Sequence, residues 1–239
     1  MLKFNGKDPI GKLIWDYQQG EKDARIEVYA NLSDPDYITG KHLFRNYKEM
    51  PKLEQKALEL AEGKILDVGA ASGCHSINLH SKGKDVECID ISPGAVAWLQ
   101  HFGLKAQQTD FFDFTYPGQF DSILMLMNGI GICGEIYELG RFFLKADELL
   151  KPGGQLIFDS SDLQYIFHET NEKILEALSP HYYGEVIYQM EYKDQRTRPF
   201  PWLFIDYQTM KEWAEAYGFK CEFIANGEHF DYLARLVKK

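Results

Sequence analysis

The sequence predicts an α/β fold, a doubly wound and mostly parallel sheet that ends in an antiparallel hairpin. Short apolar runs alternate with helical patterns over residues 64–160, and strands separated by helices pair in parallel through right-handed crossovers. The turn after the first of these runs is rich in glycine, which is typical of doubly wound sheets. Asn226-Gly227 separates the last two strand-like runs, and this dipeptide favours a hairpin.

Residues 1–62 precede the first expected strand and are expected to form a helical flap. Residues 52–62 form its clearest helix, because leucines and alanines recur there at helical spacing. Pro51 suits the first turn of that helix, and Gly63 can end it.

The expected sheet lies between residues 64 and 160. Its strands are 64–69, 85–90, 105–109, 120–127 and 155–159. Its helices are 73–82, a segment that begins after residue 92, and 135–150. Ser92 is a good N-cap, and Pro93 suits the first helical position. Lys151-Pro152-Gly153-Gly154 ends the last helix, because glycine adopts the left-handed exit and proline blocks continuation.

The remaining residues depart from this alternation. Residues 163–178 are expected to be helical, and an inserted β-hairpin is expected at about 182–206, where apolar and polar residues alternate. A helix over 207–217 precedes the two final strands. No linker or repeat is visible, so we expect one structural domain, with the flap at 1–62 and the sheet domain at 63–239.

The composition of the chain limits the partners and the location that we expect for it. The 239 residues carry a formal net charge of −10, which argues against nucleic acid as a partner, because such binding depends on Lys and Arg. No apolar run reaches the roughly 18 residues of a membrane helix, so we expect no membrane partner. The N-terminus lacks the apolar core of a signal peptide, so the cytoplasm is the expected location.

The cysteines and histidines do not predict a metal site. The four cysteines have no metal-ligand spacing, and the seven histidines are scattered. Reduced, buried thiols are expected in a cytosolic chain.

The glycine-rich turn spans residues 65–73, Ile-Leu-Asp-Val-Gly-Ala-Ala-Ser-Gly. A dinucleotide-binding turn requires Gly-x-Gly-x-x-Gly, and here Ala71 and Cys74 occupy the second and third glycine positions. Asp67 would repel a pyrophosphate, but it would suit a ligand that carries an ammonium and a sulfonium. A tight turn with no ligand is the alternative.

In these residues the chain resembles the class I S-adenosylmethionine-dependent methyltransferases, whose first motif reads acid-x-Gly-x-Gly-x-Gly. Asp67, Gly69 and Gly73 match this motif, and Ala71 replaces the middle glycine. The resemblance spans about residues 64–160 and implies S-adenosylmethionine as the cofactor. The cofactor-binding residues that it implies at the turn are Asp67, Gly69, Ala70, Ala71, Ser72 and Gly73.

Two further acids follow strands at the positions that this resemblance requires. Asp90 ends the second strand, where a carboxylate can accept the ribose hydroxyls, and Ile91 can lie on the adenine face. Asp110 and Phe111 match the positions that meet the adenine amino group and ring. The alternative for Asp90 is an acid that faces the dipole of the following helix. The alternative for Asp110 and Phe111 is an acid in a loop beside an aromatic residue of the core.

The fourth strand ends in Asn128-Gly129, which are expected to border the sulfonium and the acceptor. The members of the family that methylate amino groups of nucleic acids carry Asp/Asn-Pro-Pro-aromatic there, whereas this chain has Asn-Gly-Ile-Gly. Together with the acidic charge, this favours a small-molecule acceptor.

The candidate substrate residues are Arg45, Tyr47, His75 and Trp202. Arg45 and Tyr47 belong to the flap, which often covers the cofactor in the family; the alternative is that Tyr47 packs on the sheet and Arg45 is solvated. Trp202 lies in an aromatic-rich segment, 182–202. This segment is expected to cap the acceptor site, and the alternative is a dimerisation arm or an extended sheet edge.

No catalytic base is assigned. His75, Tyr207, His168 and His181 have suitable side chains, but none has a visible partner, so structural roles are expected. Transfer from a sulfonium is a displacement that depends mainly on alignment.

The sequence therefore favours an S-adenosylmethionine-dependent methyltransferase. A protein that binds an adenosyl ligand without catalysis and, less favoured, a NAD(P)-dependent oxidoreductase are the alternatives.

Overall fold

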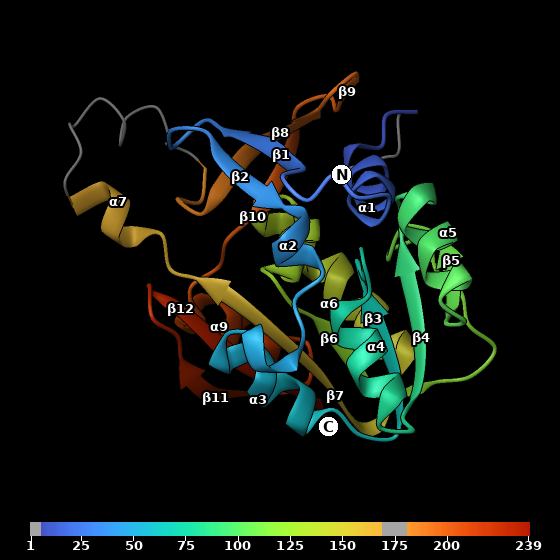
Figure 1. Cartoon of the computed structure of the whole chain (residues 1–239). Coiled ribbons are helices and arrows are strands. Elements are labelled where there is room, and N and C mark those ends of the chain that lie inside the picture. The colour runs from blue at the N-terminus through green and yellow to red at the C-terminus, as the bar shows by residue number, and fades with distance from the viewer. Residues whose placement is uncertain (1–5, 169–180) are drawn as a thin grey trace.

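A computed structural model describes residues 6–168 and 181–239 as two sheets with surrounding helices (Figure 1). The larger sheet has seven strands in the order β11-β12-β7-β6-β3-β4-β5. They are β3 (Lys64–Val68), β4 (Asp85–Asp90), β5 (Lys105–Gln108), β6 (Phe120–Met125), β7 (Leu150–Ser161), β11 (Phe219–Asn226) and β12 (Asp231–Lys238). β3 to β7 pair in parallel, whereas β12 is antiparallel to β7 and β11. The predicted doubly wound sheet with its C-terminal antiparallel pair is confirmed.

Helices cover both faces of this sheet. They are α3 (Lys52–Leu60), α4 (Cys74–Ser81), α5 (Pro93–His101), α6 (Leu139–Leu149) and α9 (Tyr207–Ala216). α6 and α9 share a core with Leu66 and Ile123, while α3, α4 and α5 share another with Ile65 and Leu124. Successive strand residues point to opposite faces, so the continuous apolar runs of β3 and β6 fill both cores.

A second, antiparallel sheet combines the N-terminal segment with the inserted hairpin. Its strands are β1 (Arg25–Ala30), β2 (Asp36–Thr39), β8 (Glu185–Tyr192), β9 (Gln195–Arg196) and β10 (Phe200–Leu203). They pair in the order β10-β8-β1-β2, with β9 on β8. Figure 1 shows this sheet on the side toward which β4 points, which is the carboxyl edge of the larger sheet.

The prediction that residues 1–62 form a helical flap is wrong in part, because β1 and β2 belong to this sheet. β1 buries Ile26 and Val28 on one face. It lies between β2 and β8, and its Val28 pairs with Met190 of β8. That pairing joins distant parts of the chain, so local sequence patterns do not reveal it. The expected hairpin is present as β8 and β10.

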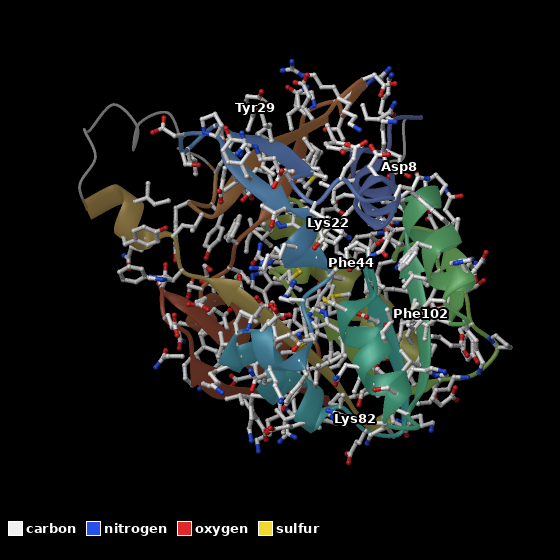
Figure 2. All side chains as sticks on the ribbon, viewed as in Figure 1. Asp8, Lys22, Tyr29, Phe44, Lys82 and Phe102 are labelled. Carbon is white, nitrogen blue, oxygen red and sulfur yellow. The ribbon has the colours of Figure 1, made fainter. Side chains whose placement is uncertain are left out.

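The helix α1 (Pro9–Gln18) holds the N-terminal segment against α5. Asp8 caps α1 by accepting from the Gly11 amide at 2.8 Å, and it also accepts from the Ser92 hydroxyl and the Gly94 amide at 2.8 and 2.9 Å. A Cβ on Gly94 would lie 2.6 Å from the Gly11 Cα, so the two backbones are in contact. One carboxylate therefore accepts from backbone amides in the first turns of two helices. Figure 2 labels Asp8 beside α1.

Short elements complete the described chain. They are α2 (Gly40–Leu43), η1 (Tyr47–Glu49), η2 (Gly129–Cys133), η3 (Ile136–Glu138) and α7 (Gln164–His168). The predicted helix 163–178 is observed in part as α7, and its portion from 169 onward lies outside the described residues. No helix in the described ranges has the length and apolar character needed to cross a membrane.

Candidate active site

A cavity of about 220 Å³ lies between the carboxyl edge of the larger sheet and the second sheet. The larger sheet contributes Val68, Gly69, Ala71, Ile89, Asp90, Ile91, Ser92, Thr109, Asp110, Phe111 and the nearby Ile132. The N-terminal segment contributes Lys7, Asp8, Pro9 and Ile10, and the second sheet contributes Met190, Thr197, Phe200 and Trp202. Ligands of open α/β sheets bind beyond the carboxyl ends of the strands, so this cavity is the candidate site.

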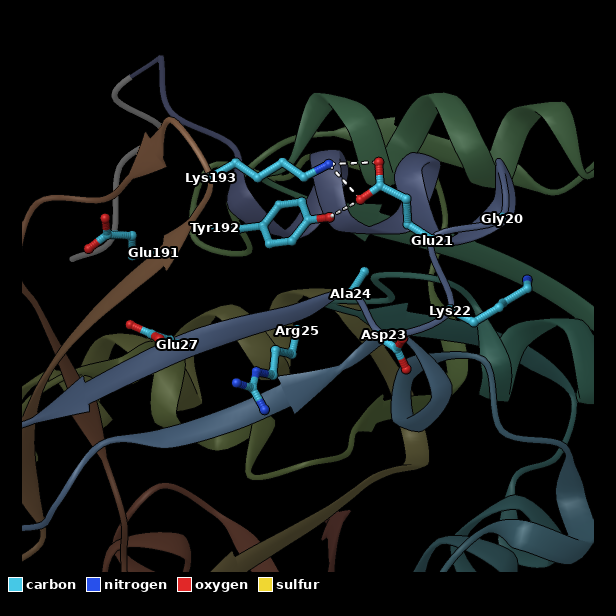
Figure 3. A pocket seen from close by; sticks show the side chains of 10 residues that line it. All are labelled: Gly20, Glu21, Lys22, Asp23, Ala24, Arg25, Glu27, Glu191, Tyr192 and Lys193. Atoms are coloured by element: carbon cyan, nitrogen blue, oxygen red, sulfur yellow. Dashed lines mark hydrogen bonds and ion pairs between the residues drawn. The ribbon is translucent and has the colours of Figure 1, made fainter.

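A larger hollow of about 640 Å³ lies elsewhere, between the loop after α1 and strands β1 and β8 (Figure 3). Its walls carry mainly charged side chains that pair with each other or with neighbours. Lys193 contacts Glu21 at 2.6 Å, and Arg196 contacts Glu191 at 3.0 Å. None of the glycine-turn or strand-end residues expected at the site lines it.

The glycine-rich turn forms one wall of the candidate cavity. Gly69 and Gly73 have positive φ values of 69° and 79°, and a Cβ on Gly69 would meet no atom within 4 Å. The turn therefore leaves open space beside Gly69. Gly73 is required for packing, since a Cβ there would lie 2.5 Å from Leu99 Cδ2. Ala71 also has a positive φ, 47°, which is unfavourable for alanine.

Asp90 holds Ala71 in this conformation. Its Oδ2 accepts from the Ala71 amide and its Oδ1 from the Ser92 amide, both at 2.8 Å. Burial raises the pKa of Asp90 to about 6, against the opposing effect of these two amides. The carboxylate is thus ionised at neutral pH and lies on the cavity wall, as the sequence predicts for a ligand-binding acid.

The other polar residues of the turn are engaged behind it. Asp67 is 2% exposed and accepts from the Ser76 hydroxyl at 2.5 Å; burial raises its pKa. Ser72 donates its hydroxyl hydrogen to the Leu43 carbonyl, and Ala70 is buried in the α3–α5 core. Asp67, Ala70 and Ser72 therefore hold the turn in place and are not among the residues that line the cavity.

Ile91, Asp110 and Phe111 line the cavity at its β4 and β5 end. Asp110 accepts from the Phe112 amide at 2.8 Å, and burial raises its pKa. Phe111 also packs on Phe142 in the α6–α9 core. Phe111 therefore lines the cavity and also belongs to the hydrophobic core.

Asn128 and Gly129 follow β6, the central strand of the larger sheet. Asn128 has a positive φ of 54°, its side-chain amide donates to the Leu203 carbonyl at 3.2 Å, and its backbone amide donates to Asp159 Oδ2 at 3.1 Å. Gly129 is buried, and a Cβ there would lie 3.1 Å from Met125 Cβ. Both residues support the η2 segment, from which Ile132 reaches the cavity.

Asp159, near the carboxyl end of β7, is a buried acid that the sequence reasoning did not single out, and it is not among the residues that line the cavity. Its Oδ1 and the Oδ1 of Asn128 are both shielded from solvent, with no hydrogen-bond partner in the described part of the chain. Burial raises the pKa of Asp159 to about 6. An acid at the end of a parallel strand is the signal that selected Asp90, and it could have selected Asp159 too.

Arg45, Tyr47 and His75, expected to contact substrate, are not among the residues that line the cavity. Arg45 is 5% exposed, not solvated as the alternative had it, and pairs with Glu54, which is also 2.9 Å from His75 Nε2. Tyr47 donates to Glu59 at 3.1 Å. These residues join the N-terminal segment to α4 behind the glycine turn. Trp202, in contrast, lines the cavity.

The expected structural roles of the other candidate bases agree with their contacts. Tyr207 donates to the Cys221 carbonyl at 3.3 Å, and His181 lies 3.3 Å from Glu185. The side chain of His168 is outside the described residues. Within the described ranges, no group of three His, Cys, Asp or Glu side chains could hold a metal ion, and the four cysteines are free.

The cavity fits an adenosyl ligand. The space beside Gly69 admits close approach to the backbone, Asp90 offers acceptor oxygens, and Ile91 and Phe111 provide apolar walls.

Comparisons with known proteins agree with this geometry. Residues 65–154 match the family described as "Methyltransferase domain". A Bacteroides fragilis SAM-dependent methyltransferase, solved with S-adenosyl-L-homocysteine, is 46% identical, with a TM-score of 0.89 over 100% of this chain and 98% of that one. The fold alone is shared with the amino pentose methyltransferase CalS10 of Micromonospora echinaspora, which is 13% identical over 81% of this chain and 94% of that chain, at a TM-score of 0.55.

Curated relatives match a shorter segment. The protein YqeM of Bacillus subtilis (strain 168), named as a methyltransferase, is 30% identical over 104 residues, 41% of this chain and 42% of that protein. The chain spans about two fifths of the length of the curated relatives that it matches. The full-length match to the Bacteroides protein, together with the glycine turn and Asp90, shows the family and the cofactor, S-adenosylmethionine. The chain belongs to the class I S-adenosylmethionine-dependent methyltransferases.

Proposed function

We propose that the protein methylates a small-molecule acceptor held between the glycine turn and the second sheet. The observation that carries this proposal is the covering of the cavity by Met190, Phe200 and Trp202 on one side and by the segment around Asp8 on another. A cavity of about 220 Å³ under such a cover suits a small molecule better than a polymer. The net charge of −10 is further support.

We assign the cofactor-binding roles as follows. The turn residues Gly69 and Ala71 provide close backbone approach, Gly73 lets the turn pack against Leu99, and Asp67, Ala70 and Ser72 hold the turn from behind. Asp90 accepts the ribose hydroxyls, Ile91 and Phe111 enclose the adenine, and Asp110 accepts from its amino group. Asn128 and Gly129 border the reacting end. When bound, the cofactor supplies a methyl group activated by a sulfonium.

Asp90 can accept a ligand without giving up its present bonds. Each carboxylate oxygen has two lone-pair sites, and the Ala71 and Ser92 amides occupy one on each oxygen. One site on each oxygen therefore remains for a vicinal pair of hydroxyls. With its pKa at about 6, the side chain is in the accepting, ionised form at neutral pH.

The chain's contribution to catalysis is alignment and exclusion of water. The Asp8 cap fixes α1 against α5 at the edge of the cavity, and the aromatic residues of β10 cover its acceptor side. Holding two reactants in a fixed orientation can supply several kcal/mol of the barrier reduction.

The experiment is transfer of labelled methyl groups from S-adenosylmethionine into a metabolite extract that is then separated by size. We expect label in the low-molecular-weight fraction. Label in protein or nucleic acid would contradict the small-molecule acceptor. Binding of S-adenosylhomocysteine without any transfer would favour the alternative of a non-catalytic binding protein.

We also propose the cytoplasm as the location. The four cysteines are free, and three of them are buried, which suits a reducing compartment. Fractionation of cells that express the protein tests this, and recovery outside the cytoplasmic fraction would contradict it.

A further inference from the structure

One face of the second sheet is apolar over the strands β10, β8 and β1. Residues that pair directly across antiparallel strands point to the same side, and so do residues two positions apart on one strand. Phe200 pairs with Tyr188, and Met190, two positions after Tyr188, pairs with Val28. Trp202 is two positions after Phe200 on β10, so these five side chains share one face.

The helix α1 covers only part of this face. Leu13 and Ile14 of α1 share a buried core with Val28 of β1. Phe200 and Trp202 lie beyond this core and line the 220 Å³ cavity instead. Removing apolar surface from water is favourable, so this part of the face is suited to an apolar occupant.

Trp202 lies at the end of the cavity opposite the nucleoside. Its indole packs against Gly131 of η2, where a Cβ would be 2.1 Å from Trp202 Nε1. The η2 segment follows β6, whereas Asp90 ends β4 and Asp110 follows β5. The strand order is β6-β3-β4-β5, so β3 and its glycine turn separate the indole from these two acids. The apolar occupant next to Trp202 is therefore the acceptor, not the adenine.

The rings of Trp202 and Phe200 form a corner. Their centroids are 6.1 Å apart, and their planes meet at 80°. Ile132, the residue after Gly131, adds an aliphatic side chain to the cavity wall. Aromatic rings pair favourably both in offset stacks and edge to face. A flat ring that stacks on one of the two side chains therefore also meets the edge of the other.

The polar groups in this part of the cavity favour a ring over a sugar. The cavity residues from η2 and the second sheet are apolar except for Thr197, the others being Ile132, Met190, Phe200 and Trp202. Thr197 Oγ1 accepts from the Met190 amide at 2.9 Å, so its own hydrogen can be donated to one ligand oxygen. A hydroxyl that is buried without a partner is unfavourable. A sugar with several hydroxyls is therefore poorly matched, whereas a flat ring with one or two polar substituents fits.

We infer that the acceptor is a planar aromatic or heteroaromatic molecule whose ring stacks on Trp202, in the corner that Trp202 forms with Phe200. This inference rests on the proposed function and deepens it by naming the substrate class. Trp202 is then the residue that determines acceptor specificity, and Gly131 provides the room for its indole.

The test uses two probes that differ in planarity. Phenol and cyclohexanol have the same ring size and one hydroxyl each, but only phenol is flat. Calorimetry measures the binding of each to protein saturated with S-adenosylhomocysteine. We expect wild-type protein to bind phenol about threefold to tenfold more tightly, because a puckered ring cannot stack on the indole. Methyl glucoside, the sugar probe, should bind more weakly than phenol.

Three variants locate this preference. Trp202→Leu should abolish it, because leucine is apolar but has no ring, and Trp202→Phe should retain most of it. Trp213→Leu is the matched control and should retain it too, because Trp213 belongs to α9 and is not among the cavity residues. The affinity for S-adenosylhomocysteine should change less than about twofold in all three variants.

Equal or tighter binding of cyclohexanol by the wild type would contradict the inference, and so would a preference for phenol that survives in Trp202→Leu. Tighter binding of methyl glucoside than of phenol would contradict it too, as would failure of phenol to bind. These outcomes leave the proposed function intact. Label in protein or nucleic acid in the transfer experiment would instead overturn the proposed function itself.

Discussion

Asp90 lies on the wall of the cavity with one oxygen bonded to the Ala71 amide and the other to the Ser92 amide. The first bond holds a left-handed alanine at the centre of the glycine turn. At the scale of single residues, one carboxylate thus fixes the shape of the turn and presents lone pairs to a ligand. Removing the Asp90 carboxylate should therefore change the conformation of the turn and weaken ligand binding.

We expect Asp90→Ala to weaken S-adenosylhomocysteine binding by at least about tenfold, since hydrogen bonds to a charged group contribute about 1.5–3 kcal/mol. Calorimetry at pH 7.5 measures this. Glu62→Ala, at an exposed position before β3, is the control. Unchanged affinity in Asp90→Ala would exclude the ribose assignment.

Asp90 should also make stability depend on pH. Its pKa is raised from 3.8 to about 6 by burial, so between those values the folded protein retains a proton that the unfolded chain has lost. The free energy of unfolding should therefore fall as the pH rises from about 4 to about 6, and Asp90 should contribute up to about 3 kcal/mol of this fall.

Urea unfolding from pH 4.5 to 7 measures this effect. Wild-type protein is compared with Asp90→Asn. The quantity compared is the slope of the unfolding free energy against pH, because the variant loses accepted hydrogen bonds at every pH. A variant that shows the same slope as the wild type would contradict the assignment of the raised pKa to Asp90.

At the scale of helices and strands, the contact between α1 and α5 fixes the N-terminal segment. Asp8 caps α1 and accepts from the Gly94 amide in the first turn of α5. Trp15 donates to the Gly94 carbonyl at 3.0 Å, and Gly11 and Gly94 allow the two backbones to touch. This contact places Asp8 and its neighbours at the cavity. A side chain at the crossing should separate the two helices.

We expect Gly94→Ala to destabilise the protein by about 1–3 kcal/mol through overpacking against backbone, and to increase hydrogen exchange in α1. Ala97→Ser, on the exposed face of the same helix, is the control. If α1 keeps its protection in Gly94→Ala, the backbone contact does not hold the segment.

The elements that the sequence predicted well are those with local signals. Ser92-Pro93 begins α5 as expected, and the apolar run from Phe120 gives β6. The glycine turn and Asp90 were found because their spacing along the chain is fixed by one strand–helix–strand unit.

The elements that were missed depend on distant pairing. β1 is recognisable as a strand only beside β8, and the ion pair of Arg45 depends on Glu54 and His75 meeting behind the turn. The bond from the Asn128 backbone amide to Asp159 likewise joins residues that are 31 positions apart. Each of these contacts is set by topology, which a single stretch of sequence does not specify.

At the scale of the whole molecule, the second sheet completes the site of the first. Its strands come from the segment before β3 and from the segment between β7 and β11, and it brings Trp202 to the cavity. The ring of Trp202 also lies against Gly131, where a Cβ would be 2.1 Å from its Nε1 atom. The acceptor side of the site therefore depends on how the two sheets fit together.

We expect Trp202→Ala to lower methyl transfer into the low-molecular-weight fraction by about tenfold or more, because alignment of the acceptor is lost. The affinity for S-adenosylhomocysteine should change much less. Tyr37→Ala, at an exposed position of the same sheet, is the control. Equal losses of transfer and cofactor affinity would contradict the division of the cavity into two parts.

Hydrogen exchange with and without S-adenosylhomocysteine tests the location of the site most directly. We expect new protection in residues 69–73, 90–92 and 109–112, which border the 220 Å³ cavity. The segments 20–27 and 191–193 around the larger hollow should not change. Protection of those two segments, with no change at the glycine turn, would contradict the account.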